Sequence, residues 1–121
     1  MAVVRYLVQD VDAALQFYAL LGFTLEARWG VPFAIAKRAD LLLWLSGPGT
    51  SASRPLQDGS QPAPGGWNRL VLECADLAQT MAELRAAGVR FRSEPIVGPG
   101  GNQVLVEDPS GNPVELFQPG S

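Results

Sequence analysis

The sequence predicts an α+β fold built from two tandem βαβββ modules. The first observation behind this prediction is an internal repeat, because at a shift of about 66 residues positions 3–11 lie over positions 69–77. The second is that each copy continues with an aspartate, an amphipathic helical stretch and a glycine. The third is that strand-like runs follow each helix. Each copy therefore reads as strand, helix and three further strands.

The length of the chain indicates its domain organisation. With 121 residues, of which 47% are hydrophobic, the chain has the size of one ordinary domain and enough apolar side chains for a core. We expect a single domain over residues 1–121, with one half at about 1–48 and the other at about 67–121. The stretch at about 46–66 is rich in Gly, Pro, Ser and Gln, which predicts a mobile linker that could fold over a pocket mouth.

Each predicted helix lies between an aspartate and a glycine. Asp10 and Asp76 can accept hydrogen bonds from the free N–H groups of a first helical turn, and Asp76 forms a capping-box-like pair with Gln79. Gly22 and Gly88 suit the left-handed position that follows a helix. Each helix has one mostly apolar stripe, so we expect both to pack on a sheet. The stripes consist of Val11, Ala14, Leu15 and Tyr18 in the first helix and of Leu77, Thr80, Met81 and Leu84 in the second.

The remaining strands follow from the apolar runs after each helix. The predicted strands are residues 24–28, 32–37 and 41–46 in the first half and residues 89–93, 103–107 and 113–118 in the second. Residues 38–40 and 108–112 have turn sequences, and Asp108 is expected to belong to its turn. The glycine-rich stretch 98–101 precedes no helix and no Lys-Ser/Thr pair, so we interpret it as a strand connection rather than a phosphate loop.

Composition and charge exclude several classes of function. A net charge of −3 with nine scattered basic residues leaves no cationic stripe, so neither nucleic acid nor an anionic membrane is an expected partner. No apolar run approaches the roughly 20 residues that cross a bilayer, and neither end has a secretion-signal pattern, which predicts a cytoplasmic protein.

The chain has no histidine, which removes the commonest metal ligand and the usual general base. Cys74 lies in an apolar run and is expected to be a buried structural thiol.

Two motifs at the correct separation carry a family resemblance. The first runs from Asp10-Val11-Asp12 through Phe17-Tyr18 to Leu21-Gly22-Phe23, and the second is Asp108-Pro109-Ser110-Gly111-Asn112-Pro113-Val114-Glu115-Leu116. Together with the repeat, they resemble the opening and closing motifs of the vicinal-oxygen-chelate superfamily of glyoxalases, bleomycin-resistance proteins and extradiol dioxygenases. The resemblance implies mixed sheets that curve around a ligand cavity, with the helices on the convex side, and a twofold homodimer.

The resemblance also implies four positions that carry metal ligands in metal-dependent members of the family. They fall on Val3, Trp44, Arg69 and Glu115, to within one place for Trp44. Only Glu115 could bind a cation, and Arg69 would place a fixed positive charge where the metal should sit. We therefore predict a member with no metal and no cofactor, in which Arg69 and Glu115 form an ion pair. The alternative is a solvated Glu115 with Arg69 turned outward.

Strand alternation predicts which side chains line the cavity. Leu42, Trp44 and Ser46 should point away from the helices, in contrast to Leu41, Leu43 and Leu45, and Arg5 should join Val3 and Leu7 on the cavity side. The predicted ligand-binding residues are Arg5, Trp29, Phe33, Trp44, Trp67, Arg69, Glu115 and Phe117. The aromatic members suit a flat organic molecule, but packing or dimer-interface roles are open for them as well.

The leading hypothesis is metal-independent binding of a hydrophobic or aromatic small molecule, similar to that of antibiotic-sequestering relatives, with no catalytic residue. The first alternative is a lyase or isomerase in which Glu115 or Glu73 is the base, or Glu115 a metal ligand, and Arg5 or Arg69 the electrophile. The second alternative is a structural or regulatory partner domain, which a cavity filled by its own side chains would favour.

Overall fold

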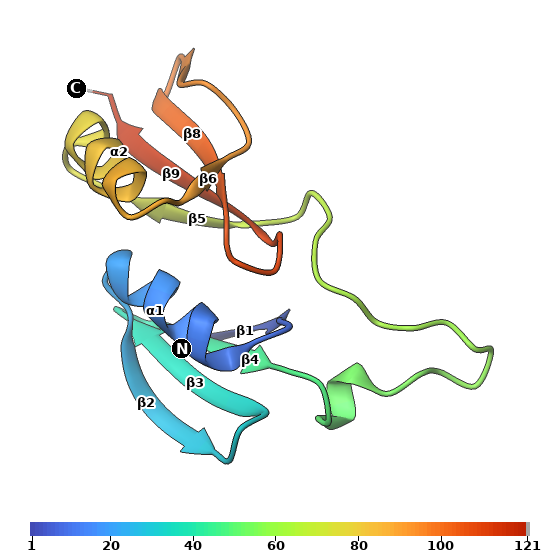
Figure 1. Ribbon diagram of the computed structural model, residues 1–121. Helices are drawn as coiled ribbons and strands as arrows, with labels where there is room; N and C mark the ends of the chain where they lie inside the picture. Colours follow the sequence, from blue (N-terminus) through green and yellow to red (C-terminus); the bar gives the residue numbers. More distant parts are fainter. Residues whose placement is uncertain (121) are drawn as a thin grey trace. The chain divides into compact units, whose positions relative to one another are not determined.

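The computed structural model describes residues 1–120 and consists of two compact units, one over Met1–Gly65 and one from Gly66 onward (Figure 1). Each unit begins with a strand, continues with one helix and ends in antiparallel strands. The predicted α+β fold with two tandem modules is confirmed. The assignment of both halves to a single domain stays a prediction.

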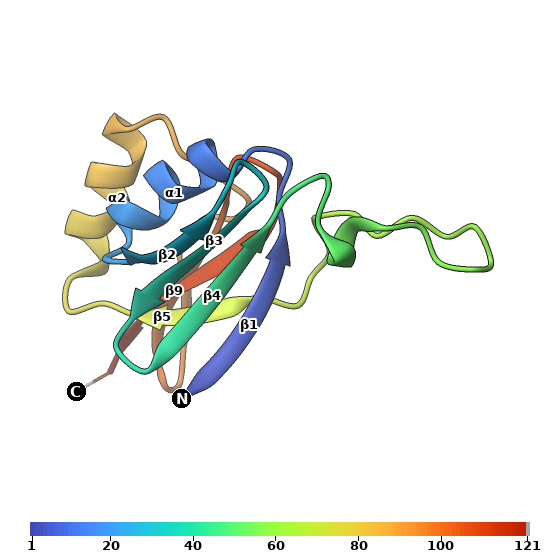
Figure 2. The same cartoon turned by 90° about the horizontal axis from the view of Figure 1, so that it is seen from below.

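The first unit is a four-stranded mixed sheet with one helix. It contains β1 (Ala2–Leu7), α1 (Val11–Leu20), β2 (Thr24–Trp29), β3 (Phe33–Arg38) and β4 (Leu41–Ser46). The strand order is β1-β4-β3-β2, in which β1 runs parallel to β4 and the other pairs are antiparallel (Figure 2). The core of this unit lies between α1 and one face of the sheet, as expected from the apolar stripe.

Small and branched residues fill that core. Ala34 and Ala36 of β3 and Leu43 and Leu45 of β4 are buried on the helix side, as strand alternation predicts. Tyr18 is buried among three aromatic neighbours, at ring-centroid distances of 4.8 Å from Phe17, 5.4 Å from Phe23 and 6.5 Å from Tyr6. The predicted stripe needs one correction, because Phe17 is buried and Leu15 only partly so.

The second unit repeats the plan with one extra strand. It contains β5 (Leu70–Glu73), α2 (Leu77–Ala86), β6 (Arg90–Phe91), β7 (Ile96–Gly98), β8 (Gly101–Glu107) and β9 (Pro113–Pro119). β5 runs parallel to β9, β8 is antiparallel to β9, and β6 and β7 both pair with β8. Stretch 98–101 is the turn between β7 and β8, so its interpretation as a strand connection is confirmed.

The strand predicted at 89–93 is wrong in its extent, and β7 was missed. The ladder breaks after Phe91 because Arg92 and Ser93 both donate their N–H groups to one carbonyl, that of Leu105, while the Ser93 hydroxyl accepts from the Leu105 N–H. Pro95, which has no N–H to donate, then separates this segment from β7.

The predicted helix caps and turns are present. Asp10 Oδ1 accepts from Ala13 N at 3.1 Å, and Asp76 Oδ1 accepts from Gln79 N at 3.0 Å. The side-chain nitrogen of Gln79 donates to Glu83 in the next turn. Gly22 and Gly88 end the two helices with φ of 88° and 80°, in the left-handed region, as expected. Asp108 accepts from the N–H groups of Ser110 and Asn112, and so belongs to its turn.

The predicted linker, nearly all of which belongs to the first unit, contains local structure. A short 3-10 helix, η1 (Ser51–Ser53), follows β4, and Leu56 N donates to Ser60 O in a turn beyond it. The side-chain nitrogen of Gln61 donates to Ser53 O at 2.7 Å and holds these two features together.

Among residues 1–120, no helix is long and apolar enough to span a membrane. Cys74, expected to be a buried thiol, is only half-buried.

Candidate functional site

One face of the sheet in the first unit is not covered by α1. Residues that are partners across neighbouring strands share a face, so the strand register defines its members. We call this surface the open face. Its paired rows are Trp29, Phe33, Ser46 and Leu7, then Ala27, Ile35, Trp44 and Arg5, then Thr24, Lys37, Leu42 and Val3.

The open face carries a continuous run of aromatic rings. The ring centroids of Trp29 and Phe33 are 5.5 Å apart with planes tilted by 35°, and those of Phe33 and Trp44 are 5.9 Å apart and nearly perpendicular. Trp29 is 61% exposed, whereas the other two are half-buried. Such edge-to-face and tilted packing holds the rings in place while leaving π-surface accessible for stacking.

Arg5 lies at one end of this aromatic run. Its guanidinium carbon is 5.0 Å from the centroid of the Trp44 ring, and its Nη1 donates to the Ser46 hydroxyl at 2.9 Å. That hydroxyl, which is buried, donates in turn to the Trp44 carbonyl at 3.4 Å. The cation is therefore held over the indole, while the residue as a whole remains exposed to solvent.

The indole nitrogen of Trp44 is unusual within the structure. Among the buried side-chain nitrogen and oxygen atoms of residues 1–120, it alone has no hydrogen-bond partner. A buried donor without an acceptor costs about 1 to 3 kcal/mol, so this position is not optimised for stability alone.

Two hollows border the first unit. A hollow of about 300 Å³ begins at Leu7 and Ser46 of the open face and is closed on its other side by Ser53, Gln61 and prolines of the linker. The linker thus borders a pocket, as the sequence suggested it could. The hollow therefore extends the open face toward the linker.

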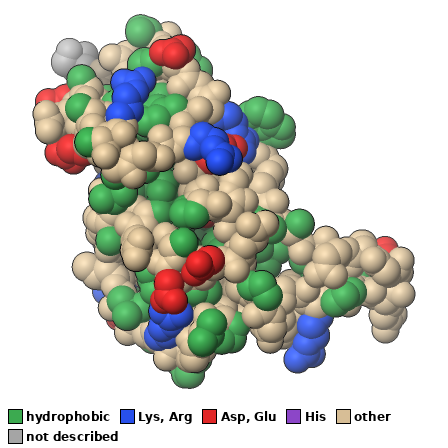
Figure 3. All heavy atoms as spheres, in the orientation of Figure 1, with side chains coloured by type: hydrophobic (Ala, Val, Ile, Leu, Met, Phe, Trp, Pro, Cys, Tyr) green, Lys and Arg blue, Asp and Glu red, His purple; other side chains and the backbone are tan. Residues whose placement is uncertain are grey.

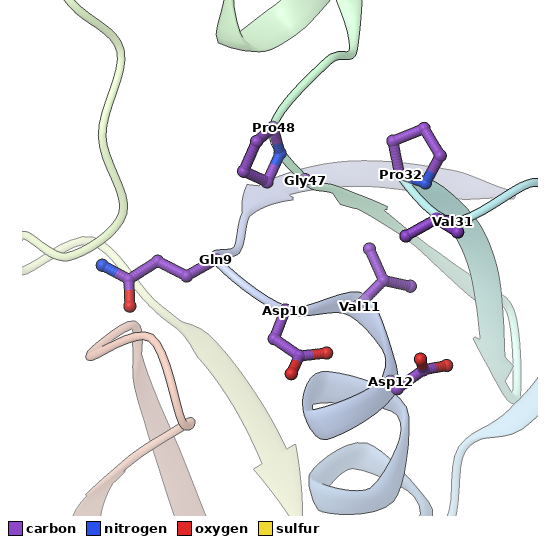
Figure 4. A pocket seen from close by; sticks show the side chains of 8 residues that line it. All are labelled: Gln9, Asp10, Val11, Asp12, Val31, Pro32, Gly47 and Pro48. Atoms are coloured by element: carbon purple, nitrogen blue, oxygen red, sulfur yellow. The ribbon is translucent and has the colours of Figure 1, made fainter.

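A second hollow, of about 400 Å³, lies at the start of α1 between Gln9, Asp12, Pro32 and Pro48 (Figure 4). Asp10, which also lines it, caps the helix, and Asp12 forms an ion pair with Arg28. Both carboxylates therefore have structural roles, and we assign this hollow no chemistry.

In the second unit, the predicted ion pair is present. Arg69 donates from Nε at 3.1 Å and from Nη2 at 2.9 Å to the same oxygen, Oε1 of Glu115. Glu115 is 8% exposed and is flanked on the neighbouring strands by its partners Val71 and Leu105. An apolar setting of this kind requires a paired carboxylate, which is why Arg69 turns inward.

The two units place their matching residues in the same way. Glu115 is the strand partner of the residue two places after Arg69, and Trp44 is the strand partner of the residue two places after Val3. The register therefore assigns Trp44 itself, without a shift of one place, to the position equivalent to Glu115.

A second ion-pair cluster in this unit was missed from the sequence. Arg92 donates from Nε at 3.1 Å and from Nη2 at 2.9 Å to Glu107 Oε2, and also to the carbonyls of Gly66 and Gly111. Its guanidinium carbon lies 4.7 Å from the centroid of the Trp67 ring. Figure 3 likewise shows basic and acidic side chains next to one another. Arg92 lies in an irregular segment, where no periodicity could have identified it.

The predicted ligand-binding residues thus fall into three groups. Arg5, Trp29, Phe33 and Trp44 are brought together on the open face. In the second unit, Arg69 contacts Glu115, and Phe117 lies on the same sheet face. Trp67 packs on Arg92 instead. Ile35 and Lys37 also belong to the open face, and the alternation in 33–37 was the signal that could have found them.

Comparison with known proteins identifies the superfamily of the chain. The family model described as the Glyoxalase/Bleomycin resistance protein/Dioxygenase superfamily matches residues 1–116. The chain belongs to this superfamily. Members of known structure share its fold over nearly the whole chain, whereas among curated protein sequences none matches significantly.

Three solved superfamily structures illustrate the likeness. TnmS3, an antibiotic binding protein from Streptomyces sp. CB03234, is 30% identical, with a TM-score of 0.73 over 98% of this chain and 93% of that protein. A superfamily member from Sphaerobacter thermophilus is 25% identical, with a TM-score of 0.75 over 98% and 95%. Lactoylglutathione lyase from Agrobacterium tumefaciens is 22% identical, with a TM-score of 0.73 over 98% and 92%, a likeness of fold alone.

The residues at the metal-ligand positions of the superfamily do not fit a metal ion in this chain. Val3 offers a hydrocarbon, Trp44 an indole and Arg69 a cation, which leaves only Glu115 with a ligand atom. Within residues 1–120, no three His, Cys, Asp or Glu side chains lie close enough to hold a cation together. We therefore derive no chemistry through a metal ion.

Proposed function

We propose that this protein binds a hydrophobic or aromatic small molecule, without a metal ion and without transforming it. The observation that carries the proposal is the continuous aromatic run of the open face, with Arg5 fixed at its end. The similarity to TnmS3, an antibiotic binding protein, supports natural products of the antibiotic kind as the ligand class. A role in antibiotic resistance by sequestration is part of the same proposal.

The magnitudes favour a planar guest. Covering about 200 Å² of apolar surface contributes about 5 kcal/mol at 25 cal/mol per Å², and each aromatic contact adds about 0.5 to 1.5 kcal/mol. Two such contacts therefore bring the total to about 6 to 8 kcal/mol, before the cost of immobilising the guest. A micromolar dissociation constant corresponds to about 8 kcal/mol. Because the total leaves little to offset the cost of ordering a flexible guest, a rigid, flat molecule is the class that this surface can hold.

Calorimetric titration with planar aromatic compounds tests the proposal. We expect Trp44→Ala to weaken binding by about tenfold or more, because it removes the central ring of the run. The matched control is Trp67→Ala, which removes an equally large ring that packs on Arg92 in the other unit. Binding that survives Trp44→Ala unchanged would contradict the proposed site.

Elemental analysis of the freshly purified protein tests the metal-independent part. We expect no metal at a stoichiometric level, since three of the four positions lack a ligand atom. One zinc, iron, manganese or nickel ion per chain, lost in Glu115→Gln, would overturn it.

An enzymatic function is the alternative, and one observation favours it. Both hydrogen bonds that Arg69 donates to Glu115 go to Oε1, and within residues 1–120 no hydrogen bond to Oε2 is made. A free carboxylate oxygen is what a general base needs in a lyase or isomerase. Turnover of a bound compound that is abolished by Glu115→Gln, with its binding retained, would establish this alternative.

We also propose that the protein forms a homodimer. Within their own units β1 and β5 are edge strands, and the apolar side chains of Val3 and Val71 on them are exposed. Edges of this kind favour association with another chain. Sedimentation equilibrium should give twice the mass of the chain, and a purely monomeric protein would contradict the proposal.

A further inference from the structure

We infer that the open face selects aromatic guests that carry an anionic group, a carboxylate or a phenolate, over aromatic cations. The inference rests on the proposed function and specifies the chemical class of its ligand. It follows from the charges on the face, from its excess of hydrogen-bond donors and from the free edge of one guanidinium.

The charges at the paired positions of the open face have one sign. Arg5 and Lys37 lie there, and no aspartate or glutamate does, although the chain as a whole has a net charge of −3. Glu26 of β2 has no strand partner, because the register shifts between Leu25 and Ala27. Attraction between unlike charges is strongest within about 10 Å, the screening length at 0.1 M salt, so a bound guest meets this local charge rather than the net charge.

The hydrogen-bonding groups of the face are mainly donors. The guanidinium of Arg5 and the ammonium of Lys37 can only donate. The Ser46 hydroxyl already accepts from Arg5 and uses its own hydrogen toward the Trp44 carbonyl. A guest that brings acceptors therefore complements these side chains, whereas one that brings donors does not.

Arg5 has an unused edge that fits a carboxylate. Its Nη1 is engaged by Ser46, and within residues 1–120 its Nε and Nη2 make no hydrogen bond. In the second unit, Arg69 and Arg92 use these same two nitrogens to hold Glu115 and Glu107. The same edge of Arg5, oriented over Trp44, is thus available for an oxyanion of a guest that stacks on the aromatic run.

Three probes with one ring system test the inference: 2-naphthoate, neutral 2-naphthamide and the cationic 2-naphthylmethylammonium ion. Calorimetry at low salt should give the order naphthoate, naphthamide, ammonium, with about tenfold or more between the first and the last. Arg5→Gln should remove most of this difference, and Arg5→Lys should retain only part, because lysine keeps the charge but lacks the fork. Circular dichroism checks that each variant is folded, and Arg54→Gln, which makes the same change of charge on the linker, should leave the order intact.

The outcomes separate this inference from the proposed function. If all three probes bind with equal affinity, and Arg5→Gln changes none of them, charge selection is refuted while aromatic binding stands. An equal loss for all three probes in Arg5→Gln also refutes selection, because Arg5 would then only support the Trp44 ring. If none of the probes binds and no other planar aromatic does, the proposed function itself fails.

Discussion

The Arg69–Glu115 ion pair gives the sharpest stability prediction. Replacing Arg69 by methionine removes the partner of a carboxylate that is only 8% exposed. At an effective dielectric constant of about 20, two unit charges about 4 Å apart attract each other by about 4 kcal/mol. Because the Arg69 side chain is 30% exposed, screening reduces this value, and we expect a loss of about 2 to 3 kcal/mol in the free energy of unfolding.

Urea denaturation and calorimetry measure this loss, which corresponds to a fall in Tm of about 10 °C for a chain of this size. The matched control is Arg90→Met, because the Arg90 side chain is 78% exposed at 3.4 Å from Glu107. This control should cost no more than about 0.5 kcal/mol. Equal effects of the two substitutions would refute the view that Glu115 depends on its partner.

A double variant shows whether the loss of stability arises from the ion pair or from packing. In Arg69→Met combined with Glu115→Leu, no buried charge remains, and we expect stability within about 1 kcal/mol of the original protein. Glu115→Gln alone should cost less than Arg69→Met, because Arg69 can turn toward water whereas Glu115 cannot. A double variant no more stable than Arg69→Met would instead indicate that the loss arises from packing.

Three further outcomes follow from local geometry. Asp76→Ala should lower the free energy of unfolding by about 1 kcal/mol in urea titrations, whereas Asp76→Asn, which can still cap the helix, should retain most of it. The pKa of Asp58 is lowered by hydrogen bonds from the hydroxyl and then the N–H of Ser60. These bonds therefore stabilise the turn at pH values above the unfolded pKa of an aspartate, about 3.9, and the stabilisation is lost as the pH falls through the folded pKa. A carboxyl-carbon NMR titration should show that Ser60→Ala moves the midpoint upward, and an unchanged midpoint would exclude this cause. Gly101→Ala should lower the free energy of unfolding by about 2 to 3 kcal/mol, which is more than Gly88→Ala should. The Cβ added at position 101 would lie 2.2 Å from a backbone oxygen, whereas a Cβ added at position 88 would meet no atom within 4 Å. Equal losses of stability in thermal unfolding would contradict the close approach.

The sequence predicted those parts of the fold that depend on local patterns. Asp10 and Gly22 mark the first helix because a cap and a left-handed residue have simple chemical requirements, and the structure confirms both. The side of the sheet on which Trp44 lies followed from strict alternation along β4. Periodicity therefore located most of the open face before its geometry was known.

The features that were missed leave no repeating pattern in the sequence. β7 pairs only with β8, and its three residues are too few to show an alternating pattern. Arg92 acquires its role from Glu107, Gly66 and Trp67, which come from two segments that lie on either side of it in the sequence. The free edge of Arg5 likewise became apparent only when its hydrogen bond to Ser46 was known.

The shared register of the two units has a practical consequence for protein engineering. Side chains on one surface of each sheet build the hydrophobic interior with a helix, whereas those on the opposite surface alternate with them along the same strands. Randomising Trp29, Ile35 and Lys37 would therefore diversify recognition while leaving the interior of that unit intact. One half of the duplicated scaffold could thus serve as a library for new binders, and its twin as a constant frame.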